Sequence, residues 1–412
     1  MKEYTPTEVK TLIEEEVERS LEGTLREGAR RMLQVALDME VASYIESCKE
    51  RRDEKGHREV VRNGHHRERT LVTGVGPIPI RQPRVDDRRE DCQFTSSILP
   101  RYMRRTPSID ALIPTLYLKG VSTSQFPEAL QAILGEGVSG LSSANIVRLK
   151  SIWEEEYQSW QKRDLTGKHY VYVWADGIYF NVRLQPDRPC VLVLIGATAD
   201  GHKELIAIED GHRESKLSWQ GLLQDLKARG LTDLPAIAVG DGALGFWAAL
   251  REEFPETQEQ RCWVHKTANV LDKLPNSLQK QAKKLLHQMY MAPTKEEGLE
   301  VFDRFIDLYE AKYPKACECL SQDKEGLFTF YNFPAAHWRH LRTTNPIEST
   351  FGTVRHRTRQ TKGCGSRKAT LSMVFKLAIE AEKHWQRLHC YKLIGLVVEG
   401  VPFVDGELKK AA

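Results

Sequence analysis

The sequence predicts an α/β protein: a mixed sheet with flanking helices, interrupted by an all-helical insertion and preceded by helical N-terminal regions. Three observations support this class. Residues 170–262 alternate short β-like runs with amphipathic helical patterns, and the nearly all-apolar run 190–197 is expected to be a central strand. Residues 275–333 have only helical spacing of apolar side chains. Residues 106–150 contain three short helical patterns separated by glycine-containing turns.

Length and composition narrow the class of protein. A chain of 412 residues exceeds the usual size of one domain. The formal net charge is only +3, so the whole molecule is not a polycation, and any nucleic-acid contact must come from local patches. No apolar run is long enough to cross a bilayer, and the N-terminus lacks a signal-peptide pattern. Eight scattered cysteines are typical of reduced thiols in a cytoplasmic protein.

The patterns divide the chain into seven expected segments. Residues 7–48 carry apolar side chains at three-to-four spacing, which predicts helix. The basic stretch 49–69 is broken by Gly56 and Gly64 and is interpreted either as a mobile connector that lies along phosphates or as a solvated linker. The segments are an N-terminal helical region (1–50), a basic connector with a short hairpin (51–105), a helix-turn-helix-like DNA-binding domain (106–165), the first part of the core (166–274), the helical insertion (275–336), the second part of the core with the final helices (337–390) and a C-terminal tail (391–412).

The helix-turn-helix interpretation depends on three serines that can begin helices. In such a module the last helix enters a DNA groove, and here it would present Ser143, Asn145 and Arg148. Generic packing of three helices gives the same pattern, so both interpretations stay open. The predicted N-caps are Ser108, Ser122, and either Ser142 or Ser143.

Two Asp-Gly pairs follow β-like runs. Asp176-Gly177 comes after the expected strand 170–175 and before a second expected strand, 178–183. Asp241-Gly242 comes after the run 235–239. An acid at a strand end, followed by glycine, presents a carboxylate at the rim of a sheet with room for a ligand. Alternatively, both pairs are simple turn formers.

A third acid, Glu348, lies in a stretch of the sequence whose other charged residues are basic. Glu348 is the only acidic residue from His337 to Lys368. Asn345 can cap the helix that begins here, with Pro346 in its first position and Glu348 completing a capping box, but an isolated carboxylate also suits a metal ion beside a polyanion. Because Glu348 follows Asp241 by 107 positions (348 − 241), a helical insertion must separate the two acids. The basic residues of this span are Arg339, Arg342, Arg355, Arg357, Arg359, Lys362, Arg367 and Lys368.

Four motifs in this order resemble the signature of Mutator-type bacterial insertion-sequence transposases. They are Trp174-Ala175-Asp176-Gly177, Val239-Gly240-Asp241-Gly242-Ala243, Cys262-Trp263-Val264-His265 and Asn345-Pro346-Ile347-Glu348-Ser349. The resemblance extends from about Arg67 to about Gly406. It implies an RNase H-like catalytic fold with an all-helical insertion before the last acid. By this resemblance Asp176, Asp241 and Glu348 are the catalytic, metal-binding DDE triad, and Cys262 and His265 match the family's Cys-x-x-His pair.

The expected chemistry requires hard cations. Cleavage and joining of phosphodiesters by in-line attack is served by two divalent ions, and Mg²⁺ prefers carboxylate oxygens, with Mn²⁺ as an expected substitute. Basic side chains after Glu348 would then hold DNA phosphates without reading bases. These expected contacts are Arg355, Arg357, Arg359, Lys362, Arg367 and Lys368.

The cysteines near the third motif raise the alternative of a zinc site. Cys262 and His265 are followed about fifty residues later by Cys317 and Cys319, but this is not a standard zinc spacing. The favoured interpretation is that Cys262 and His265 form a packed, hydrogen-bonded pair that supports the sheet beside the active site. Asn345 is expected to give further structural support near the site.

The sequence therefore predicts a DNA transposase that binds the terminal inverted repeats of its element and catalyses Mg²⁺-dependent strand cleavage and strand transfer. The alternatives are an RNase H-like nuclease or resolvase that cleaves without joining, and a DNA-binding regulator without catalysis. The expected partners are double-stranded DNA, at the element ends and the target, and a second copy of the chain. No membrane is expected as a partner, and the expected location is the bacterial cytoplasm, at the nucleoid.

Overall fold

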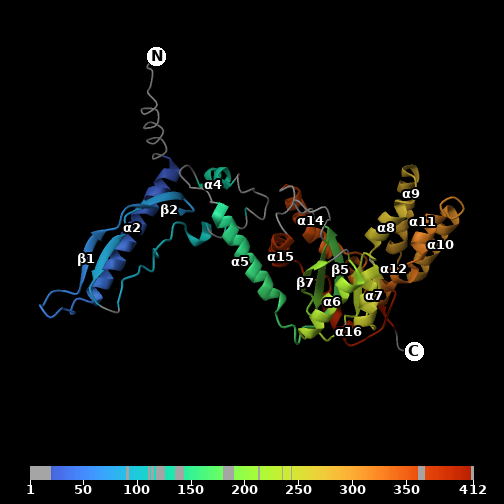
Figure 1. Ribbon diagram of the computed structural model, residues 1–412. Coiled ribbons are helices and arrows are strands. Elements are labelled where there is room, and N and C mark those ends of the chain that lie inside the picture. Colours follow the sequence, from blue (N-terminus) through green and yellow to red (C-terminus); the bar gives the residue numbers. More distant parts are fainter. Residues whose placement is uncertain are drawn as a thin grey trace, which may run out of the picture. The chain divides into compact units, whose positions relative to one another are not determined.

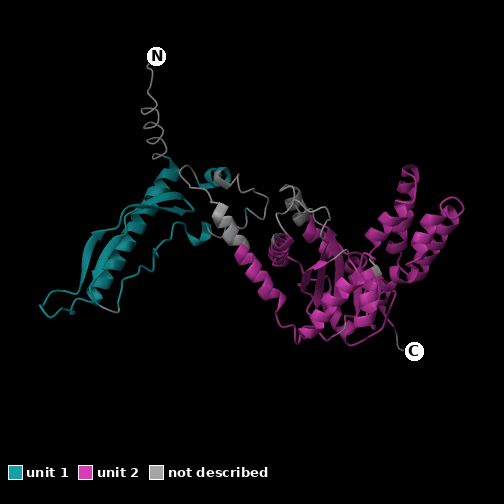
Figure 2. Ribbon diagram, in the orientation of Figure 1, with its two compact units in different colours: residues 1–147 teal, residues 148–412 magenta. Residues whose placement is uncertain are grey.

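The structure is a computed structural model, and it divides into two compact units, residues 1–147 and 148–412 (Figures 1 and 2). The division falls within helix α5 (Ser143–Gln161), inside the range expected for the helix-turn-helix-like domain. The residues described are 20–89, 92–109, 112, 116, 126–134, 143–179, 190–211, 214–233, 235–242, 244–360 and 367–409.

The first unit is built on one long helix packed against strands. Ser20 caps α2 (Leu21–Ser47) by accepting a hydrogen bond from the Gly23 amide. The strands form two antiparallel pairs, and Leu37 of α2 packs with Leu71 and Ile80 in a common core. The strands are β1 (Val60–His65), paired with β4 (Pro83–Asp87), and β2 (Arg69–Thr73), paired with β3 (Gly76–Ile80).

Strand β1 differs from the mobile connector expected for residues 49–69. The pairing of β1 with β4 joins residues that are distant in sequence, such as Val60 and Asp87, and Tyr44 on α2 donates a hydrogen bond to Asp87 at the end of β4. A composition rich in arginine and glycine gives no sign of such long-range pairing, because it describes only local preference. The connector interpretation is therefore replaced by a folded two-stranded pair.

The helix-turn-helix-like region is described only in part. Helices α4 (Phe126–Leu134) and α5 have helical backbones. Most of the expected first helix, residues 108–118, lies outside the described residues. The three-helix arrangement therefore stays a prediction.

The second unit contains a mixed five-stranded sheet in the order β7-β6-β5-β8-β9. Strands β5, β6 and β7 are antiparallel neighbours, whereas β8 and β9 run parallel to β5. The mixed α/β class predicted from the sequence is confirmed by this sheet and the helices around it. The strands are β5 (Tyr170–Tyr179), β6 (Cys190–Thr198), β7 (Lys203–Gly211), β8 (Ile237–Gly240) and β9 (Gln258–Arg261).

The prediction that a strand ends before Asp176-Gly177 and a second one begins at residue 178 is wrong. Strand β5 runs through this dipeptide to Tyr179, and Asp176 pairs with Val193 while Gly177 pairs with Leu192. Gly177 is not among the glycines with positive φ, so the pair does not make the turn that Asp-Gly favours elsewhere. The apolar partner strand β6 holds the backbone extended. The remainder of the expected second strand, residues 180–183, lies outside the described residues.

Helices cover both faces of this sheet. On one face, Trp219 of α6 (Lys216–Ala228) and Phe246 of α7 (Leu244–Glu253) pack with strand residues such as Val173 and Ala175 in the main core. On the other face, the indole of Trp174 donates to the carbonyl of His340 in α13. Odd and even positions of β5 therefore point to different helical layers. The second layer contains α13 (Trp338–Leu341), α14 (Asn345–Gln360) and α15 (Arg367–Glu382).

A run of helices separates β9 from α14, and it accounts for the distance between the second and third acids. Its interior is rich in aromatic side chains, among them Phe302, Phe305 and Phe328, which are all buried. The helices are α8 (Trp263–Leu271), α9 (Asn276–Met291), α10 (Lys295–Tyr309), α11 (Pro314–Ser321) and α12 (Lys324–Leu327), followed by the 3₁₀ turns η1 (Thr329–Asn332) and η2 (Ala335–His337). The chain ends with η3 (Tyr391–Leu393), α16 (Ile394–Val398), β10 (Phe403–Val404) and β11 (Glu407–Leu408).

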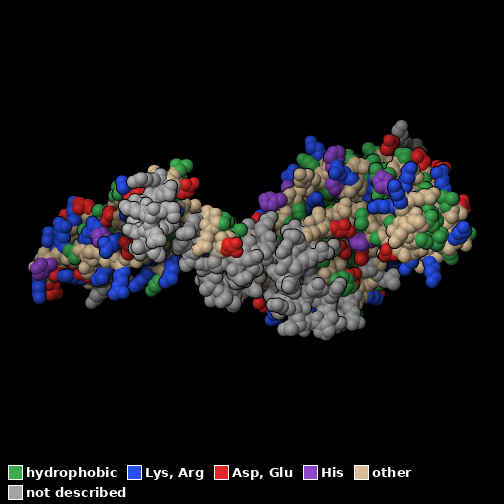
Figure 3. Space-filling model, turned by 90° about the horizontal axis from the view of Figure 1, so that it is seen from above, with side chains coloured by type: hydrophobic (Ala, Val, Ile, Leu, Met, Phe, Trp, Pro, Cys, Tyr) green, Lys and Arg blue, Asp and Glu red, His purple; other side chains and the backbone are tan. Residues whose placement is uncertain are grey.

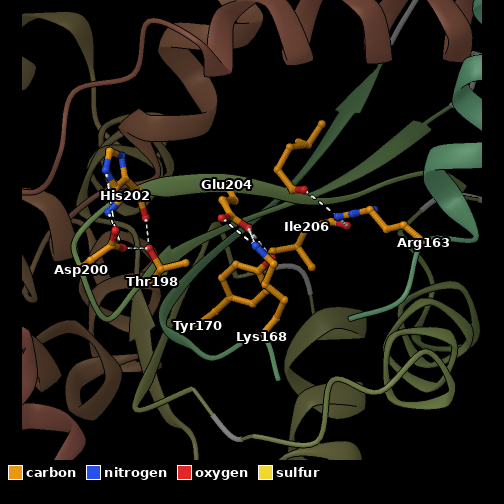
Figure 4. Close-up of polar contacts among 9 residues, drawn as sticks. Arg163, Lys168, Tyr170, Thr198, Asp200, His202, Glu204 and Ile206 are labelled. Carbon is orange, nitrogen blue, oxygen red and sulfur yellow. Dashed lines mark hydrogen bonds and ion pairs between the residues drawn. The ribbon is translucent and has the colours of Figure 1, made fainter. Parts of the chain in front are cut away.

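Polar contacts tie the start of β5 to β7 (Figure 4). Glu204 accepts hydrogen bonds from Lys168 and from the Tyr170 hydroxyl, and Arg163 donates to the carbonyls of Leu205 and Ile206. This cluster lies at the end of β5 opposite to Asp176. Within the described part of the chain, no helix is both long and apolar enough to cross a membrane.

Candidate active site

The strand register brings two of the candidate acids together. Strands β5 and β8 are parallel neighbours, and Ala175 pairs with Gly240 where the ladder between them ends. Asp176 and Asp241 each come one position later. Parallel register thus sets the two aspartates at the same level of adjacent strands.

Asp176 is buried, and its surroundings disfavour a negative charge. Only 5% of the residue is exposed. Burial raises the pKa of this carboxyl to about 7, and the charges of Asp241, Glu214 and Glu348 add to the rise, while the charge of His265 opposes it. The charges of three other carboxylates therefore act on Asp176. The electrostatic potential around this residue is negative.

Glu348 reaches the site from the first turn of α14. Ile347 and Phe351 on the same helix are fully buried and hold its start in place. The expected capping role of Asn345 is wrong, because the helix begins one residue earlier: the carbonyl of Thr344 accepts from the Glu348 amide, and Asn345 is exposed. Sequence reasoning missed this role of Thr344, which is also fully buried.

The Cys-x-x-His pair lies directly against Glu348. His265 Nε2 is 3.5 Å from Glu348 Oε1. The thiol of Cys262 accepts hydrogen bonds from the amide of Thr344 at 3.3 Å and from its hydroxyl at 3.5 Å. Thr344 Oγ1 also lies 3.5 Å from Glu348 Oε1. One connected group of side chains therefore joins the end of β9 to the start of α14.

This group favours a charged imidazole. Hydrogen bonding to Cys262 raises the pKa of His265 to about 9, with further help from the charges of Cys262, Asp176 and Asp241. Burial acts to raise the pKa of Cys262, but the hydrogen bond and charge of His265 lower it below its ordinary value. An imidazolium at this position partly compensates the acids around it.

Possible ligand atoms of Cys262, His265 and Glu348 all lie within 4.8 Å of one another. Neither Cys317 nor Cys319 belongs to this group. The contact from α8 to Cys319 is instead a hydrogen bond from Lys266 Nζ to the Cys319 carbonyl. Zinc binding by all four Cys and His residues thus gains no support from the structure.

A fourth acid, Glu214, was not expected from the sequence, and its charge acts on Asp176. It occupies the connection between β7 and α6, and a Cβ atom at Gly177 would overlap its side chain. Burial raises the pKa of Glu214, and the charge of Asp241 raises it further. A glutamate before a predicted helix looks like an ordinary first-turn acid, so only the pairing of distant strands identifies it.

The expected DNA-binding residues occupy three parts of the chain. Ser143, Asn145 and Arg148 lie in the helical backbone of α5, and the arginines that follow Glu348 lie in that of α14, but these side chains are outside the described set. Arg367 forms a 2.7 Å ion pair with Asp210 on β7, and Lys368 lies 3.8 Å from Glu154. The arginines of α14 are Arg355, Arg357 and Arg359, and Lys362 falls outside the described residues.

Comparison with known proteins places the chain in a family. The model of the family described as "Transposase, Mutator family" matches residues 2–388. The chain is 48% identical to the transposase for insertion sequence element IS6120 of Mycolicibacterium smegmatis, over 72% of this chain and 91% of that protein. It is 48% identical to the transposase for insertion sequence element IST2 of Acidithiobacillus ferrooxidans, over 68% of this chain and 94% of that protein.

More distant similarity extends along more of the chain. The transposase for insertion sequence element IS256 in transposon Tn4001 of Staphylococcus aureus is 28% identical over 84% of this chain and 88% of that protein. A solved Drosophila P element transposase strand transfer complex aligns with a TM-score of 0.28 at 9% identity, over 70% of this chain and 84% of that one, which is too low to bear on the fold. The family match and the 48% identical relatives together decide the assignment: this chain belongs to the Mutator family of transposases.

Proposed function

We propose that this transposase binds the terminal inverted repeats of an insertion sequence and catalyses Mg²⁺-dependent DNA cleavage and strand transfer. The catalytic acids in this proposal are Asp176, Asp241 and Glu348. The observation that carries it is the register of the parallel strands β5 and β8, which sets Asp176 beside Asp241. Glu348 acts electrostatically on the same carboxyl from α14.

The sheet topology supports an RNase H-like catalytic core. Its first three strands form an antiparallel meander, and its last two are parallel to the first. The acids lie on β5, directly after β8 and on a helix that follows a helical insertion. This order agrees with the fold implied by the sequence motifs.

The donor set fits a hard divalent cation. Asp176 is nearly fully buried, and burial is the main cause of its raised pKa. The charges of Asp241, Glu214 and Glu348 raise the pKa further, and a divalent ion would offset both effects. Carboxylate oxygens are the ligands that Mg²⁺ and Mn²⁺ prefer. Asp176, Asp241 and Glu348 would hold two such ions, which supply activation of the attacking hydroxyl and stabilisation of the leaving oxygen when bound.

The chain's own residues position the third acid. His265 and Thr344 both contact Glu348 Oε1, and Cys262 holds Thr344 through its thiol. These contacts join α8 to α14. They therefore fix the Glu348 carboxylate relative to the end of β9. We assign these three residues a positioning role.

DNA contacts are proposed on both units. On α5 we retain Ser143, Asn145 and Arg148 as groove contacts, and in the second unit we retain the basic residues that follow Glu348 as phosphate contacts. In the first unit, Lys and Arg side chains are spread over the face seen in Figure 3. The exposed basic residues of the stretch 49–69 include Arg51, Arg52, Lys55, Arg58, Arg62 and Arg67. Joining two ends requires two active sites, so we propose a homodimer on DNA.

The test is a cleavage and joining assay with full-length protein, Mg²⁺ and duplex DNA carrying the inverted repeats that flank the gene. The wild type is expected to cut at the repeat ends and to join them to a target. Glu348→Gln is expected to bind the ends and to produce neither product. Cleavage without joined product would instead favour a nuclease or resolvase, and end binding unchanged in a protein without any cleavage would favour a regulator.

A further inference from the structure

A thiol, an imidazole and a carboxylate meet where α8 and α14 begin. Cys262 directly precedes α8, His265 lies in the first turn of that helix, and Glu348 lies in the first turn of α14. One ligand atom from each of these residues lies within 4.8 Å of the other two. The fold therefore gathers three different metal-binding side chains from two distant parts of the sequence.

The spacing of these atoms suits one tetrahedral ion. Zinc lies about 2.0–2.2 Å from a histidine nitrogen or a carboxylate oxygen and about 2.3 Å from a thiolate, so its ligand atoms are about 3.3–3.6 Å apart. His265 Nε2 lies 3.5 Å from Glu348 Oε1. The imidazole and the carboxylate already have the separation that an ion requires, and the thiol of Cys262 lies within reach of it.

The sulfur is held from the side that faces away from the imidazole. Cys262 is fully buried, and Thr344 donates to its thiol from both the backbone amide and the hydroxyl. Such donors orient a metal-binding sulfur and stabilise its thiolate form. The side chains of His265 and Glu348 are 33% and 27% exposed, so an ion can enter the group from solvent.

The hydrogen bonds of this group are incomplete. His265 Nδ1 is buried and has no hydrogen-bond partner. A buried polar atom without a partner is rare in folded proteins, and it calls for an explanation such as an ion or a water. A support made only of hydrogen bonds between these side chains does not account for this nitrogen.

The donor set selects a softer ion than Mg²⁺. Thiolate and imidazole ligands favour Zn²⁺ and similar transition-metal ions, whereas Mg²⁺ prefers oxygen ligands. Three protein ligands leave a fourth position for water. The group therefore differs in its metal preference from Asp176 and Asp241, although it shares Glu348 with them.

We propose that Cys262, His265 and Glu348 form a second metal site, which takes Zn²⁺ or another divalent ion that favours sulfur. On binding, the protons of the thiol and of the imidazolium are released to solvent. The ion engages the Glu348 carboxylate, so it withdraws this acid from Mg²⁺ and inhibits DNA cleavage. The inhibition rests on the proposed function of Glu348, whereas the binding of the ion does not.

The ordinary alternative is a support without a metal, in which Cys262, Thr344 and His265 only hold Glu348 in place. In that case the thiol would never become a metal ligand. Co²⁺ distinguishes the two roles, because it occupies tetrahedral zinc sites and absorbs light in a way that depends on its ligands.

The test is a titration of reduced, full-length protein with Co²⁺, followed by absorption spectroscopy. A thiolate ligand gives a charge-transfer band in the near ultraviolet, and a tetrahedral ion gives bands in the visible. The wild type should develop both, Zn²⁺ should remove them, and excess Mg²⁺ should leave them in place.

Variants assign the ligands. Cys262→Ser should lose the charge-transfer band, whereas His265→Asn and Glu348→Gln keep the thiol and should weaken Co²⁺ binding at least about tenfold. Cys390→Ser is the matched control, because Cys390 Sγ forms an exposed contact of 3.2 Å with His389 Nδ1 outside this group. This control should give the spectrum of the wild type.

Circular dichroism without metal checks that each variant is folded. If Cys262→Ser does not fold, the partly exposed His265→Asn decides the matter. A wild type without a charge-transfer band, or a band that persists in folded Cys262→Ser, would overturn the inference, as would undiminished Co²⁺ affinity in His265→Asn.

A cleavage assay separates the metal site from its effect on Glu348. Zn²⁺ added to wild-type protein in excess Mg²⁺ should inhibit cleavage. A band that depends on Cys262, together with cleavage that Zn²⁺ does not affect, would reject the inhibition and keep the metal site. The same band in a protein that cleaves no DNA with Mg²⁺ would count against the proposed function alone.

Discussion

His265 Nε2 lies 3.5 Å from Glu348 Oε1, so an imidazole from α8 holds the acid that begins α14. The contact joins residues that are separated by the helical run α9–α12. The histidine is also linked to Cys262, whose hydrogen bond raises the pKa of the imidazole to about 9. Glu348 thus faces a cation at neutral pH.

Replacement of His265 by Asn should lower DNA cleavage about ten- to hundredfold, because residues that orient metal ligands typically contribute that much. Binding to the element ends should stay near the wild-type level, since the imidazole is not proposed to touch DNA. Both quantities are measured on the same preparation, by product yield and by gel shift. His287→Asn, on the exposed face of α9, is the control. Cleavage at the wild-type rate in His265→Asn would contradict the positioning role.

Mg²⁺ should raise the melting temperature of the wild type, because it relieves repulsion among the acids around Asp176. At a concentration of about 100 times Kd, the gain is about 2.7 kcal/mol, which corresponds to a shift of several degrees. Asp176→Asn removes a buried carboxyl with a raised pKa. This variant should melt higher than the wild type without metal and should not respond to Mg²⁺.

The control for this melt is Asp303→Asn, on the exposed surface of α10. It should respond to Mg²⁺ like the wild type. A wild-type melting curve that is the same with and without Mg²⁺ would argue against a cluster of metal-binding acids. Ca²⁺ in place of Mg²⁺ tests whether the response needs only a hard divalent cation.

Glu382, at the end of α15, should make stability depend on pH. Burial raises its pKa to about 7, and the charge of Glu204 adds to the rise, while Arg163 and Lys168 oppose it. The folded protein keeps this proton up to about pH 7, whereas the unfolded chain releases it near its ordinary pKa of 4.5. Glu382 therefore lowers the free energy of unfolding. This effect grows as pH rises from 4.5 to about 7 and is fully present at higher pH.

Glu382→Gln should accordingly raise the melting temperature at about pH 8 and change it little at about pH 5, where the wild-type carboxyl is largely protonated when folded. Glu380→Gln is the matched control two residues away, because Glu380 is exposed and its ion pair with Lys383 lowers its pKa. That control should give no stabilisation at either pH. An equal effect of Glu382→Gln at both pH values would exclude titration as the cause.

Arg357 and Arg359 should contribute to DNA affinity without regard to sequence. Removal of one side chain that binds a phosphate should reduce the slope of log K against log salt by about 1. The double variant Arg357→Ala/Arg359→Ala is therefore expected to bind specific and unrelated duplexes more weakly and with a flatter salt dependence. Fluorescence anisotropy at several salt concentrations measures both.

Arg251→Ala is the comparison for this measurement, because Arg251 is already paired with Glu259 at 2.6 Å. Its salt slope should equal that of the wild type. A slope in the double variant that matches the wild type would mean that these arginines do not contact phosphates.

The Mutator family and the mixed α/β class could be predicted because motif spacing and apolar periodicity are local properties of the sequence. The continuity of β5 through Asp176-Gly177 could not, since Asp-Gly favours a turn and only pairing with β6 keeps it extended. The cap at Thr344 was missed by one position, because Asn345 has the better local preference while Thr344 gains its role from burial against Cys262.

Glu214 shows the same limit for the candidate site. Nothing in its neighbourhood along the chain distinguishes it from other helix-start acids. Its position is seen only in the fold, where its side chain packs against Gly177 on the face of β5 opposite to Asp176. A single sequence therefore indicates motif acids readily, whereas acids recruited by topology require the fold.

The pairing of β5 with β8 also has a consequence for the order of synthesis. Trp174 pairs with Val239, so a ribosome must release the intervening antiparallel strands and α6 before the two aspartates can meet. Pairings between distant segments form slowly, because the loop must close before any contact compensates its entropy. Glu348 emerges later still, after the helices α8–α13. A nascent or prematurely terminated chain can thus fold its first unit well before it acquires three acids, so such fragments would lack the proposed catalytic site.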